Sequence, residues 1–343
     1  MLKLLSPLLT ATVTLTLTAG SAQPLVIAHR GASGYLPEHT LAAKTLAYEM
    51  GADYLEQDVV LTRDDVPVVM HDVQLETTTD VAQRFPDRKR ADGHYYALDF
   101  TLAEIKQLQA HERTNPKTGK VVFPKRFPLG QSSFKVPTLE EELQLIAGLN
   151  KTLGRRVGIY PEIKQAAWHR RQGHDISRIV LPILRRYGYA TKQDPCWVQC
   201  FEIDENQRIR GELGWKGNLL LLLGSGGKRP DGTPDPWFTP AGLAEAAKTV
   251  DGVGPSLHAI VTGTSPADRV VTDFVKHAHA AGLVVHPYTL RADELPKFFA
   301  SVEDAEEVLF NQAGIDGLFT DFPDLAVRWR STHLKTTHKS DSR

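Results

Sequence analysis

Short apolar stretches alternate with amphipathic segments along most of the 343-residue chain, and this alternation constrains the fold more than any other feature. Continuous apolar runs are typical of strands buried on both faces of a parallel sheet. The strands we expect cover residues 25–28, 54–60, 66–70, 157–162, 196–201, 218–223, 283–286 and 317–320. The helices we expect cover residues 40–50, 138–149, 175–187, 204–213, 239–249, 266–281 and 292–300.

This alternation predicts an α/β protein, specifically a (β/α)8 TIM barrel built from the expected strands. A doubly wound open sheet is the alternative. No GxGxxG motif opens the first expected helix, which weakens a dinucleotide-binding version of that alternative.

One long interruption breaks the alternation after the third expected strand. Residues 73–136 are polar, basic and rich in turn residues, as in DRKRADGHYY and FPKRFPLGQSSF, with one short helical piece near 101–110. Loops of this length are usually functional. We therefore expect a small insertion domain over one loop of the barrel, the alternative being an irregular surface excursion.

The two ends of the chain differ from the rest. Residues 1–22 combine Lys3, an apolar threonine-rich stretch and small residues near Ala22, which predicts a secretory signal peptide cleaved near Ala22. A membrane anchor is the alternative, but the stretch is short for a span and contains Pro7. We expect a periplasmic or secreted protein, a barrel over residues 23–331 and a disordered tail over 332–343.

Charge and cysteine content exclude several other classes. The net charge of −1 gives no basic field for nucleic acid or an anionic membrane surface, so the expected partner is a small molecule. Cys196 and Cys200 lie about 13 Å apart along one strand, beyond the roughly 7 Å between Cα atoms that a disulfide allows. We expect two buried thiols. The oligomeric state is left open, with a dimer as one option.

Polar side chains gather at the ends of the expected strands, which is where the active site of a (β/α)8 barrel lies. These residues are His29, Arg30, Glu56, Asp58, His71, Asp72, Glu162, Lys164, Gln199, Phe201, His286, Tyr288 and Asp321. Any one of them is readily explained as a solvated strand end or a structural hydrogen-bonding group. Their arrival together at one rim is harder to explain in that way.

The acids predict a metal site. Glu56 and Asp58 are two residues apart, so both point to the same face of a strand. Two buried carboxylates repel each other, and a cation resolves the repulsion. With Glu162 they form a set of hard oxygen ligands that suits Ca²⁺ or Mg²⁺ rather than zinc.

The bases and cations predict chemistry on a phosphate. His29 and His71 are suited to general acid and general base catalysis near neutral pH. Arg30 presents a planar set of donors that matches phosphate oxygens, and Lys164 adds a second positive group. A phosphate ester is the expected substrate.

Four motifs resemble those of a known family. IAHRGASGYLPEHT, LEQDVVLTRDDVPVVMHD, PEIK and GLFTDFPD resemble the glycerophosphodiester phosphodiesterase family, in this order and over nearly the whole mature chain. The signal peptide and the insertion are similar to those of the periplasmic, calcium-using branch. The resemblance implies a barrel that hydrolyses glycerophosphodiesters to glycerol 3-phosphate and an alcohol, with an insertion that covers the glycerol end of the site.

The resemblance also implies a role for each site residue. His29 and His71 would be the acid/base pair, and Glu56, Asp58 and Glu162 would hold one divalent cation, Ca²⁺ first and Mg²⁺ as the alternative. Arg30, Lys164, Phe201 and Tyr288 complete the expected phosphate- and substrate-binding set. The glycine-rich segment 224–228 matches no motif of the family and is interpreted as a flexible turn.

Other functions remain open at this point. The same residues could cleave a lysophospholipid, as in lysophospholipase D-type enzymes. The chain could also be a non-catalytic barrel that binds phosphodiesters, or a surface-displayed adhesin-like module. No GxSxG, CxxC or HExxH motif occurs, which argues against a serine-hydrolase elbow, a structural zinc site and a zinc protease.

Overall fold

The computed structural model describes residues 23–131, 133–224, 227, 233 and 235–333. The predicted signal peptide, most of the glycine-rich segment and the chain from residue 334 lie outside the described residues. The last helix, α12 (Pro323–His333), includes the first two residues of the predicted tail, so that part of the prediction is wrong. Among the helices of the described ranges, none has the length and apolar character that crossing a membrane requires.

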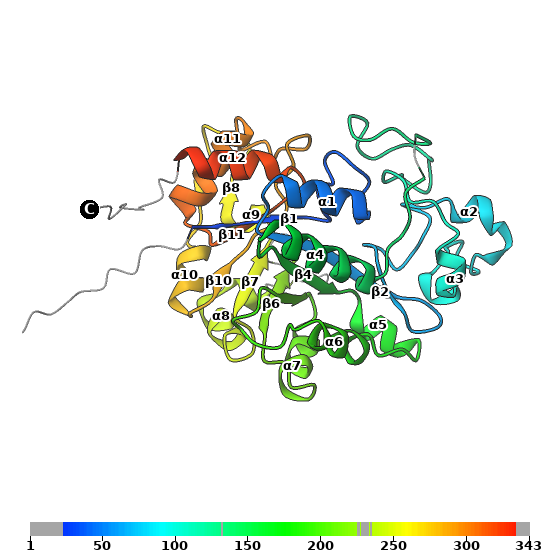
Figure 1. The fold of residues 1–343 in the computed structure, drawn as a ribbon. Helices are drawn as coiled ribbons and strands as arrows, with labels where there is room; N and C mark the ends of the chain where they lie inside the picture. The colour runs from blue at the N-terminus through cyan, green and yellow to red at the C-terminus, as the bar shows by residue number, and fades with distance from the viewer. Residues whose placement is uncertain (1–22, 132, 225–226, 228–232, 234, 334–343) are drawn as a thin grey trace, which may run out of the picture.

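Eight parallel strands form the barrel (Figure 1). They are β1 (Leu25–Ala28), β2 (Tyr54–Leu61), β4 (Gly158–Ile163), β5 (Trp197–Cys200), β6 (Asn218–Leu223), β7 (Gly252–Pro255), β10 (Val284–Val285) and β11 (Gly317–Thr320). Their order is β10-β7-β6-β5-β4-β2-β1-β11. Two backbone bonds of 3.0 Å, from Asp316 N to Val285 O and from Phe319 N to Pro287 O, join the ends of this order. The predicted (β/α)8 barrel is confirmed.

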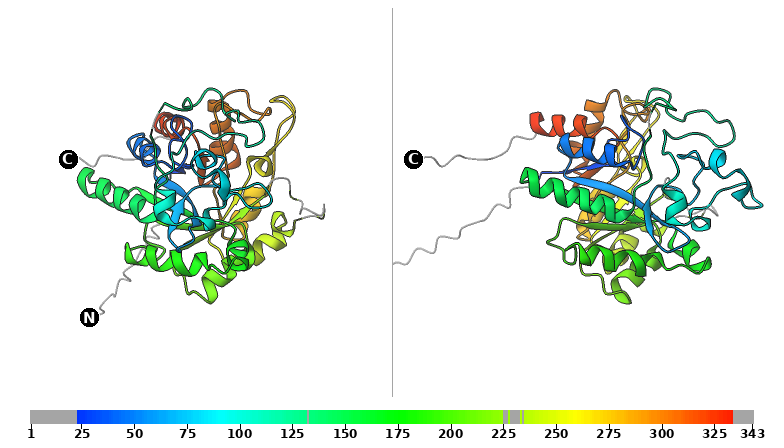
Figure 2. Two further views of the ribbon diagram at one scale, coloured as in Figure 1. Left: turned by 90° about the vertical axis from the view of Figure 1, so that its right-hand side faces the viewer. Right: turned by 45° about the vertical axis from the view of Figure 1, so that its right-hand side comes forward.

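Helices surround the barrel, as the two turned views of Figure 2 show. They are α1 (Leu41–Glu49), α4 (Leu139–Leu153), α5 (Ala166–Arg171), α6 (Ile176–Arg186), α7 (Ile203–Gly211), α8 (Pro240–Ala246), α9 (Leu257–Ile260), α10 (Phe274–Ala280), α11 (Val302–Glu306) and α12. A π-helical segment, Glu307–Ala313, continues α11, and a 3₁₀ turn, Pro236–Phe238, precedes α8. Local sequence sets these limits: Thr138 and Glu141 form a capping box before α4, and Gly154 ends it at φ 64°.

The interior of the barrel is filled by side chains and is not a channel. Tyr160, Trp197 and Phe319 pack there with three aliphatic residues. His286, which the sequence placed among the strand-end residues, is buried in this interior, where its Nδ1 lies 2.8 Å from the Tyr160 hydroxyl. It is therefore a packing residue with a satisfied hydrogen bond. Cys196 and Cys200 are buried free thiols, as expected.

One strand assignment is wrong. The expected strand at 66–70 forms β3 (Pro67–Val69), but β3 runs antiparallel to β2 and is outside the barrel. The missing barrel strand is β7, whose sequence GVGP lacks the apolar run that identified the others. Neighbouring strands explain its glycines, because a Cβ at Gly252 would lie 2.7 Å from Cγ2 of Val284.

Two helix assignments are also wrong. The predicted helix 266–281 begins only at Phe274, because the preceding residues form a hairpin of β8 (Val261–Thr262) and β9 (Val270–Val271). The predicted helix 292–300 is an irregular segment with turns. Residues 294–298 of this second stretch line the cavity at the rim of the barrel.

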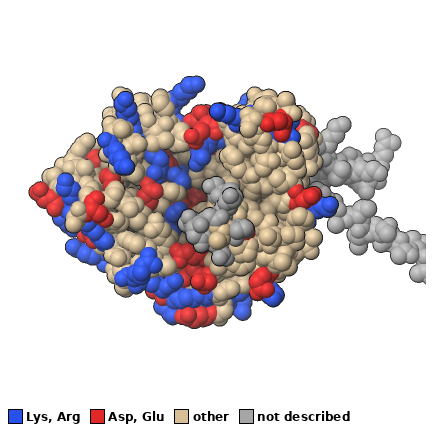
Figure 3. Space-filling view, turned by 180° about the vertical axis from the view of Figure 1, so that it is seen from behind, with Lys and Arg blue, Asp and Glu red and all other residues tan. Residues whose placement is uncertain are grey.

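Residues 73–136 form a small unit between the second and third barrel strands, β2 and β4, to one side of the barrel (Figure 1). It contains α2 (Val81–Arg84), α3 (Leu102–Ile105) and two 3₁₀ turns, Pro86–Arg88 and Ala97–Asp99. Its buried apolar residues, including Leu75, Phe100 and Ile105, form a cluster with Val60 of β2 and Val68 of β3, so the unit packs against these two strands. On the left of Figure 3, the same side of the molecule, basic residues are interspersed with acidic ones.

Candidate active site

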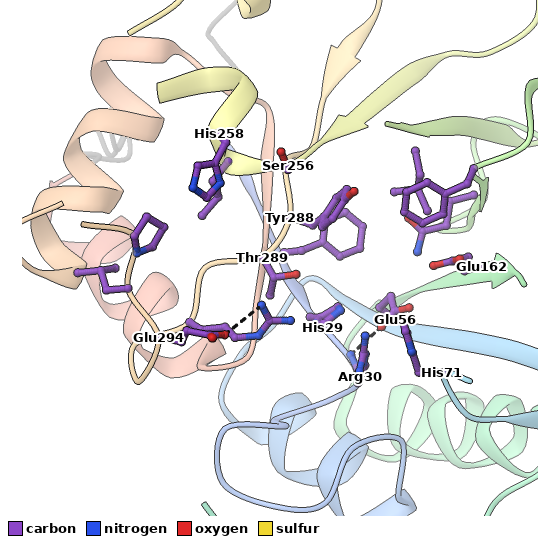
Figure 4. Close-up of a pocket in the computed structure, with 18 of the residues that line it drawn as sticks. His29, Arg30, Glu56, His71, Glu162, Ser256, His258, Tyr288, Thr289 and Glu294 are labelled. Atoms are coloured by element: carbon purple, nitrogen blue, oxygen red, sulfur yellow. Dashed lines mark hydrogen bonds and ion pairs between the residues drawn. The ribbon is translucent and has the colours of Figure 1, made fainter. Parts of the chain in front are cut away.

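A cavity of about 770 Å³ opens at the carboxyl ends of the barrel strands (Figure 4). Every residue of the predicted site lines it: His29, Arg30, Glu56, Asp58, His71, Glu162, Lys164, Phe201 and Tyr288. These side chains come from six separate parts of the chain, on or after β1, β2, β3, β4, β5 and β10, so the fold brings together what the sequence separates.

His29 directly follows β1 and is oriented by a carboxylate. Its Nδ1 lies 2.6 Å from Oδ1 of Asp321, which follows β11. Burial lowers the pKa of His29 to about 4, helped by Arg30 and opposed by Asp321. Burial alone would raise the pKa of Asp321, but His29 and two arginines hold it well below its ordinary value. An ionised carboxylate only accepts, so Nδ1 carries the proton and Nε2 is free to take another.

His71 reaches the same cavity by a different route. It follows the antiparallel strand β3, and the bond from Met70 N to Asp58 O, 2.9 Å long, aligns that return with β2. Its Nδ1 lies 2.6 Å from Oδ1 of Asp72. Burial lowers the pKa of His71 to about 4, and Arg30 and Lys164 lower it further. Both histidines are therefore neutral at pH 7, with an aspartate on Nδ1.

Glu56 and Asp58 form a buried pair on β2, as the spacing predicts. Glu56 accepts from the backbone amide of Arg30 at 2.6 Å, in a turn where Arg30 has φ 59°. Burial and Asp58 raise the pKa of Glu56 well above its ordinary value. Burial alone would also raise the pKa of Asp58, but Lys164 and His71 hold it well below that value. The two neighbouring carboxyls repel each other, and a divalent cation would relieve that repulsion.

Among the described residues, His39, Glu56 and Asp58 have ligand atoms within 4.8 Å of one another, and this group fits a divalent cation. It shares two members with the predicted ligand set. The third predicted ligand, Glu162, instead has Oε1 at 2.8 Å from Nζ of Lys164. Burial raises the pKa of Glu162 to about 8, against the effect of Lys164.

The sequence did not single out His39, although it lies in the PEHT part of the first family motif. Its Nε2 lies 2.8 Å from Oδ2 of Asp58, and its Nδ1 lies 3.5 Å from Nζ of the buried Lys44. A lysine ammonium can only donate, so Nδ1 is the acceptor and Nε2 carries the proton. In this arrangement His39 donates a hydrogen bond to Asp58.

Arg30 and Lys164 supply positive charge on either side of Asp58. The guanidinium of Arg30 lies 3.1 Å from both oxygens of Glu38 and 3.3 Å from Asp58. Lys164 Nζ lies 3.4 Å from Oδ1 of Asp58, and the ion pairs raise its pKa against the effect of burial. Both side chains line the cavity, and their ion pairs orient them for binding a phosphate group.

Phe201 and Tyr288 make part of an apolar wall. Their ring centroids are 5.9 Å apart, and the Tyr288 hydroxyl donates to Leu223 O at 2.7 Å. The wall continues into segments that the sequence did not suggest, at residues 256–264 and 289–298. Figure 4 shows His258 and Glu294 at this end, beyond His29 and Thr289. No sequence motif identifies these loops. Their residues reach the cavity only in the folded barrel, where the loops that follow β7 and β10 lie at the same rim as β1.

A profile of the family described as "Glycerophosphoryl diester phosphodiesterase family" matches residues 29–325. The chain is 43% identical over 331 residues to a glycerophosphodiester phosphodiesterase of Haemophilus influenzae, covering 91% of each chain. It is 38% identical to one of Treponema pallidum, covering 91% of this chain and 94% of that one.

Solved structures show the same fold. A crystal structure described as a putative glycerophosphoryl diester phosphodiesterase of Silicibacter pomeroyi matches with a TM-score of 0.66 at 24% identity, over 90% of this chain and 94% of that one. An Oleispira antarctica phosphodiesterase in complex with the product sn-glycerol-3-phosphate matches with a TM-score of 0.60 at 22% identity, over 90% and 96% of the two chains. By sequence over nearly its whole described length, the chain belongs to the glycerophosphoryl diester phosphodiesterase family and is an enzyme of that phosphodiesterase class.

Proposed function

We propose that the protein hydrolyses glycerophosphodiesters, such as glycerophosphocholine and glycerophosphoethanolamine, to sn-glycerol 3-phosphate and an alcohol. One observation carries the proposal: two neutral, aspartate-oriented histidines line one cavity with a buried carboxylate pair and two cations. The names of the bacterial relatives and the glycerol phosphate in the Oleispira structure support it.

A divalent cation completes the site in this proposal. When bound, the cation would neutralise the negative charge of the phosphate and the additional negative charge that develops on it during the reaction. Glu56, Asp58 and Glu162 would hold it, because His39 Nε2 carries a proton in the arrangement that Lys44 imposes. We propose Ca²⁺, with Mg²⁺ as the competitor, because a set of protein carboxylates, two on β2 and one on β4, suits Ca²⁺, whereas Mg²⁺ usually keeps several waters and is held by one or two carboxylates.

The histidines move the protons. The free Nε2 of one imidazole takes the proton of the attacking oxygen, which belongs either to water or to the glycerol 2-hydroxyl. Attack by the 2-hydroxyl gives a cyclic phosphate, which a water molecule then opens to glycerol 3-phosphate. The other imidazole, once protonated, gives its proton to the departing alcohol. A bound phosphate anion favours that protonation, since negative charge beside an imidazole raises its pKa. Arg30 and Lys164 hold the phosphate in line between the two.

The apolar far wall favours one second candidate. Leu257, Leu295, Pro296 and Phe298 line the cavity and would accommodate an acyl chain, as lysophospholipase D-type cleavage requires. Measuring the release of choline from glycerophosphocholine and from lysophosphatidylcholine distinguishes the two activities. A phosphodiester-binding protein without turnover is not favoured, because binding requires cations and donors but no pair of free imidazole nitrogens.

We further propose that the protein acts in the periplasm or outside the cell, as residues 1–22 suggest. Fractionation of the native host tests this, with cleavage near Ala22 read from the mature N-terminus.

Chelation tests the proposed function. The protein is treated with a chelator, freed of it, and assayed for glycerol 3-phosphate release from glycerophosphocholine before and after each metal is returned. We expect activity to vanish and to return with Ca²⁺ more fully than with Mg²⁺. Undiminished activity after complete chelation would refute the metal-dependent mechanism.

A further inference from the structure

Two arginines of the insertion reach the rim of the barrel, and each contacts the aspartate that orients one of the histidines. Arg126 contacts Asp321, the partner of His29. Arg113 contacts Asp72, the partner of His71. The sequence marked neither arginine, because both lie in a polar, turn-rich stretch without a motif.

Arg126 is almost fully buried although its segment is a surface loop. Its side chain is 4% exposed. Nη2 donates to Oδ2 of Asp321 at 2.7 Å, and Nε donates to Asp293 at 2.8 Å. The guanidinium lies over the ring of Phe123, 3.7 Å from its centroid. This many directed contacts fix the position of a planar group.

Arg113 has an equivalent arrangement at the other histidine. Nη1 donates to Oδ2 of Asp72 at 2.7 Å, and Nε and Nη2 donate to the two oxygens of Glu38 at 2.9 and 2.6 Å. Glu38 in turn accepts from Arg30 at 3.1 Å. Arg113 therefore contacts Asp72, which orients His71, and also Glu38, which binds Arg30.

The two aspartates divide their oxygens in the same way. In each, Oδ1 faces the imidazole Nδ1 at 2.6 Å and Oδ2 faces the arginine at 2.7 Å. Because the arginine holds Oδ2, the direction of Oδ1 is also fixed. Oδ1 then orients the imidazole and keeps the proton on Nδ1. Each aspartate has one further donor, Arg291 for Asp321 and Thr77 for Asp72.

We infer that Arg113 and Arg126 are positioning residues, through which the insertion sets the tautomer and direction of both imidazoles. The insertion is then a working part of the active site and not only a cover over it. This inference rests on the proposed roles of His29 and His71.

The test compares Arg126→Gln and Arg113→Gln with a matched control, Arg90→Gln. Arg90 is an arginine of the same insertion that forms a two-pronged ion pair, with Asp99 at 2.7 and 2.8 Å, away from the cavity. The full chain is labelled with ¹⁵N-histidine, and the tautomers of His29 and His71 are read from long-range ¹H–¹⁵N spectra. Substitution of each histidine by Gln assigns its signals among the 13 histidines.

We expect the unsubstituted protein to show the Nδ1–H tautomer at both histidines. Arg126→Gln should move His29 toward a tautomer mixture and leave His71 unchanged, whereas Arg113→Gln should do the reverse. Each should lower kcat by about 10- to 100-fold, as small misplacements of reacting groups do. Arg90→Gln should change neither the spectra nor kcat.

The inference is overturned if the two Gln variants behave like Arg90→Gln. It is also overturned if each variant disturbs both histidines equally, because the insertion would then act as one unit and not through the individual arginine–aspartate contacts. Arg126→Lys and Arg113→Lys keep one charged donor and should retain the tautomer with a smaller loss of kcat. If a Gln variant does not fold, the corresponding Lys variant tests the inference in its place. A Lys variant in which the histidine tautomer is disturbed also overturns the inference. Spectra are independent of turnover, so absence of any phosphodiesterase activity would refute the proposed function without deciding this inference.

Discussion

His39 Nε2 lies 2.8 Å from Oδ2 of Asp58, while the buried ammonium of Lys44 faces the opposite nitrogen of the same ring. Because an ammonium has no acceptor, the imidazole donates to Asp58 and does not offer it a lone pair. His39 therefore lies close enough to the carboxylates to resemble a metal ligand, yet its chemistry is that of a support for one.

Calorimetric titration with Ca²⁺ distinguishes these roles. Glu162→Gln removes a charged ligand and should weaken binding at least tenfold, roughly. His39→Leu removes the donor to Asp58 and should weaken binding by about 10- to 100-fold, whereas His39→Gln keeps an N–H donor and should stay near the unsubstituted value. Normal Ca²⁺ binding by Glu162→Gln would show that Glu162 is not a ligand.

The pair of Lys44 and Glu142 gives a prediction about stability. Both side chains are fully buried, with Nζ 3.0 Å from Oε2, and Nζ also donates to the backbone carbonyl of Glu56. Lys44→Met strands the carboxyl and should lower the free energy of unfolding by about 3–5 kcal/mol, while Lys44→Met with Glu142→Leu should recover most of the loss.

Denaturant unfolding measures this effect. The matched control is Lys248→Met, which breaks an exposed pair with Glu245 of 2.5 Å and should cost less than about 0.5 kcal/mol. A double variant no more stable than Lys44→Met would show that the loss is not due to the stranded carboxyl.

Glu306 gives a prediction about pH. It is 1% exposed, and Oε1 has no hydrogen-bond partner in the described part of the chain. Burial, followed by Glu303, raises its pKa to about 8. A carboxyl with a raised pKa binds its proton more tightly when folded, so its stabilisation is complete in acid and is lost as the pH rises toward 8.

Glu306→Gln removes that dependence. Between pH 5 and 9 the unfolding free energy of the variant should fall less than that of the unsubstituted protein, leaving the variant about 1–3 kcal/mol ahead at pH 9. Glu307→Gln, at a neighbouring half-exposed position, is the matched control. Parallel curves for Glu306→Gln and the unsubstituted protein would contradict the raised pKa.

The part of the site predictable from sequence follows from two simple rules. Strand alternation places Glu56 and Asp58 on one face, and parallel strands deliver their end residues to one rim. These rules fail where the chain departs from them. Residues 66–70 have the composition of a barrel strand but fold back on β2, and a one-dimensional pattern does not record the direction of pairing.

Other parts depend on tertiary structure alone. His39 lies against Asp58 in the loop between β1 and α1, where Arg30 and His39 both adopt positive φ, 59° and 62°, and no local pattern predicts the shape of this loop. Arg113 and Arg126 lie in a polar loop with the composition of an ordinary solvated surface, and only the finished fold brings them against Asp72 and Asp321. The packing of β7 required glycines, which removed the apolar signal that marks a strand.

The most direct test of the account is the turnover of glycerophosphocholine by His29→Ala and His71→Ala, with His279→Ala as control because His279 is exposed and pairs with Asp316. Release of glycerol 3-phosphate is followed with metal and substrate saturating. We predict that each of the first two variants loses at least about 100-fold in kcat, while the control is unchanged. Near-normal turnover by either His29→Ala or His71→Ala would contradict the assignment of the acid/base pair.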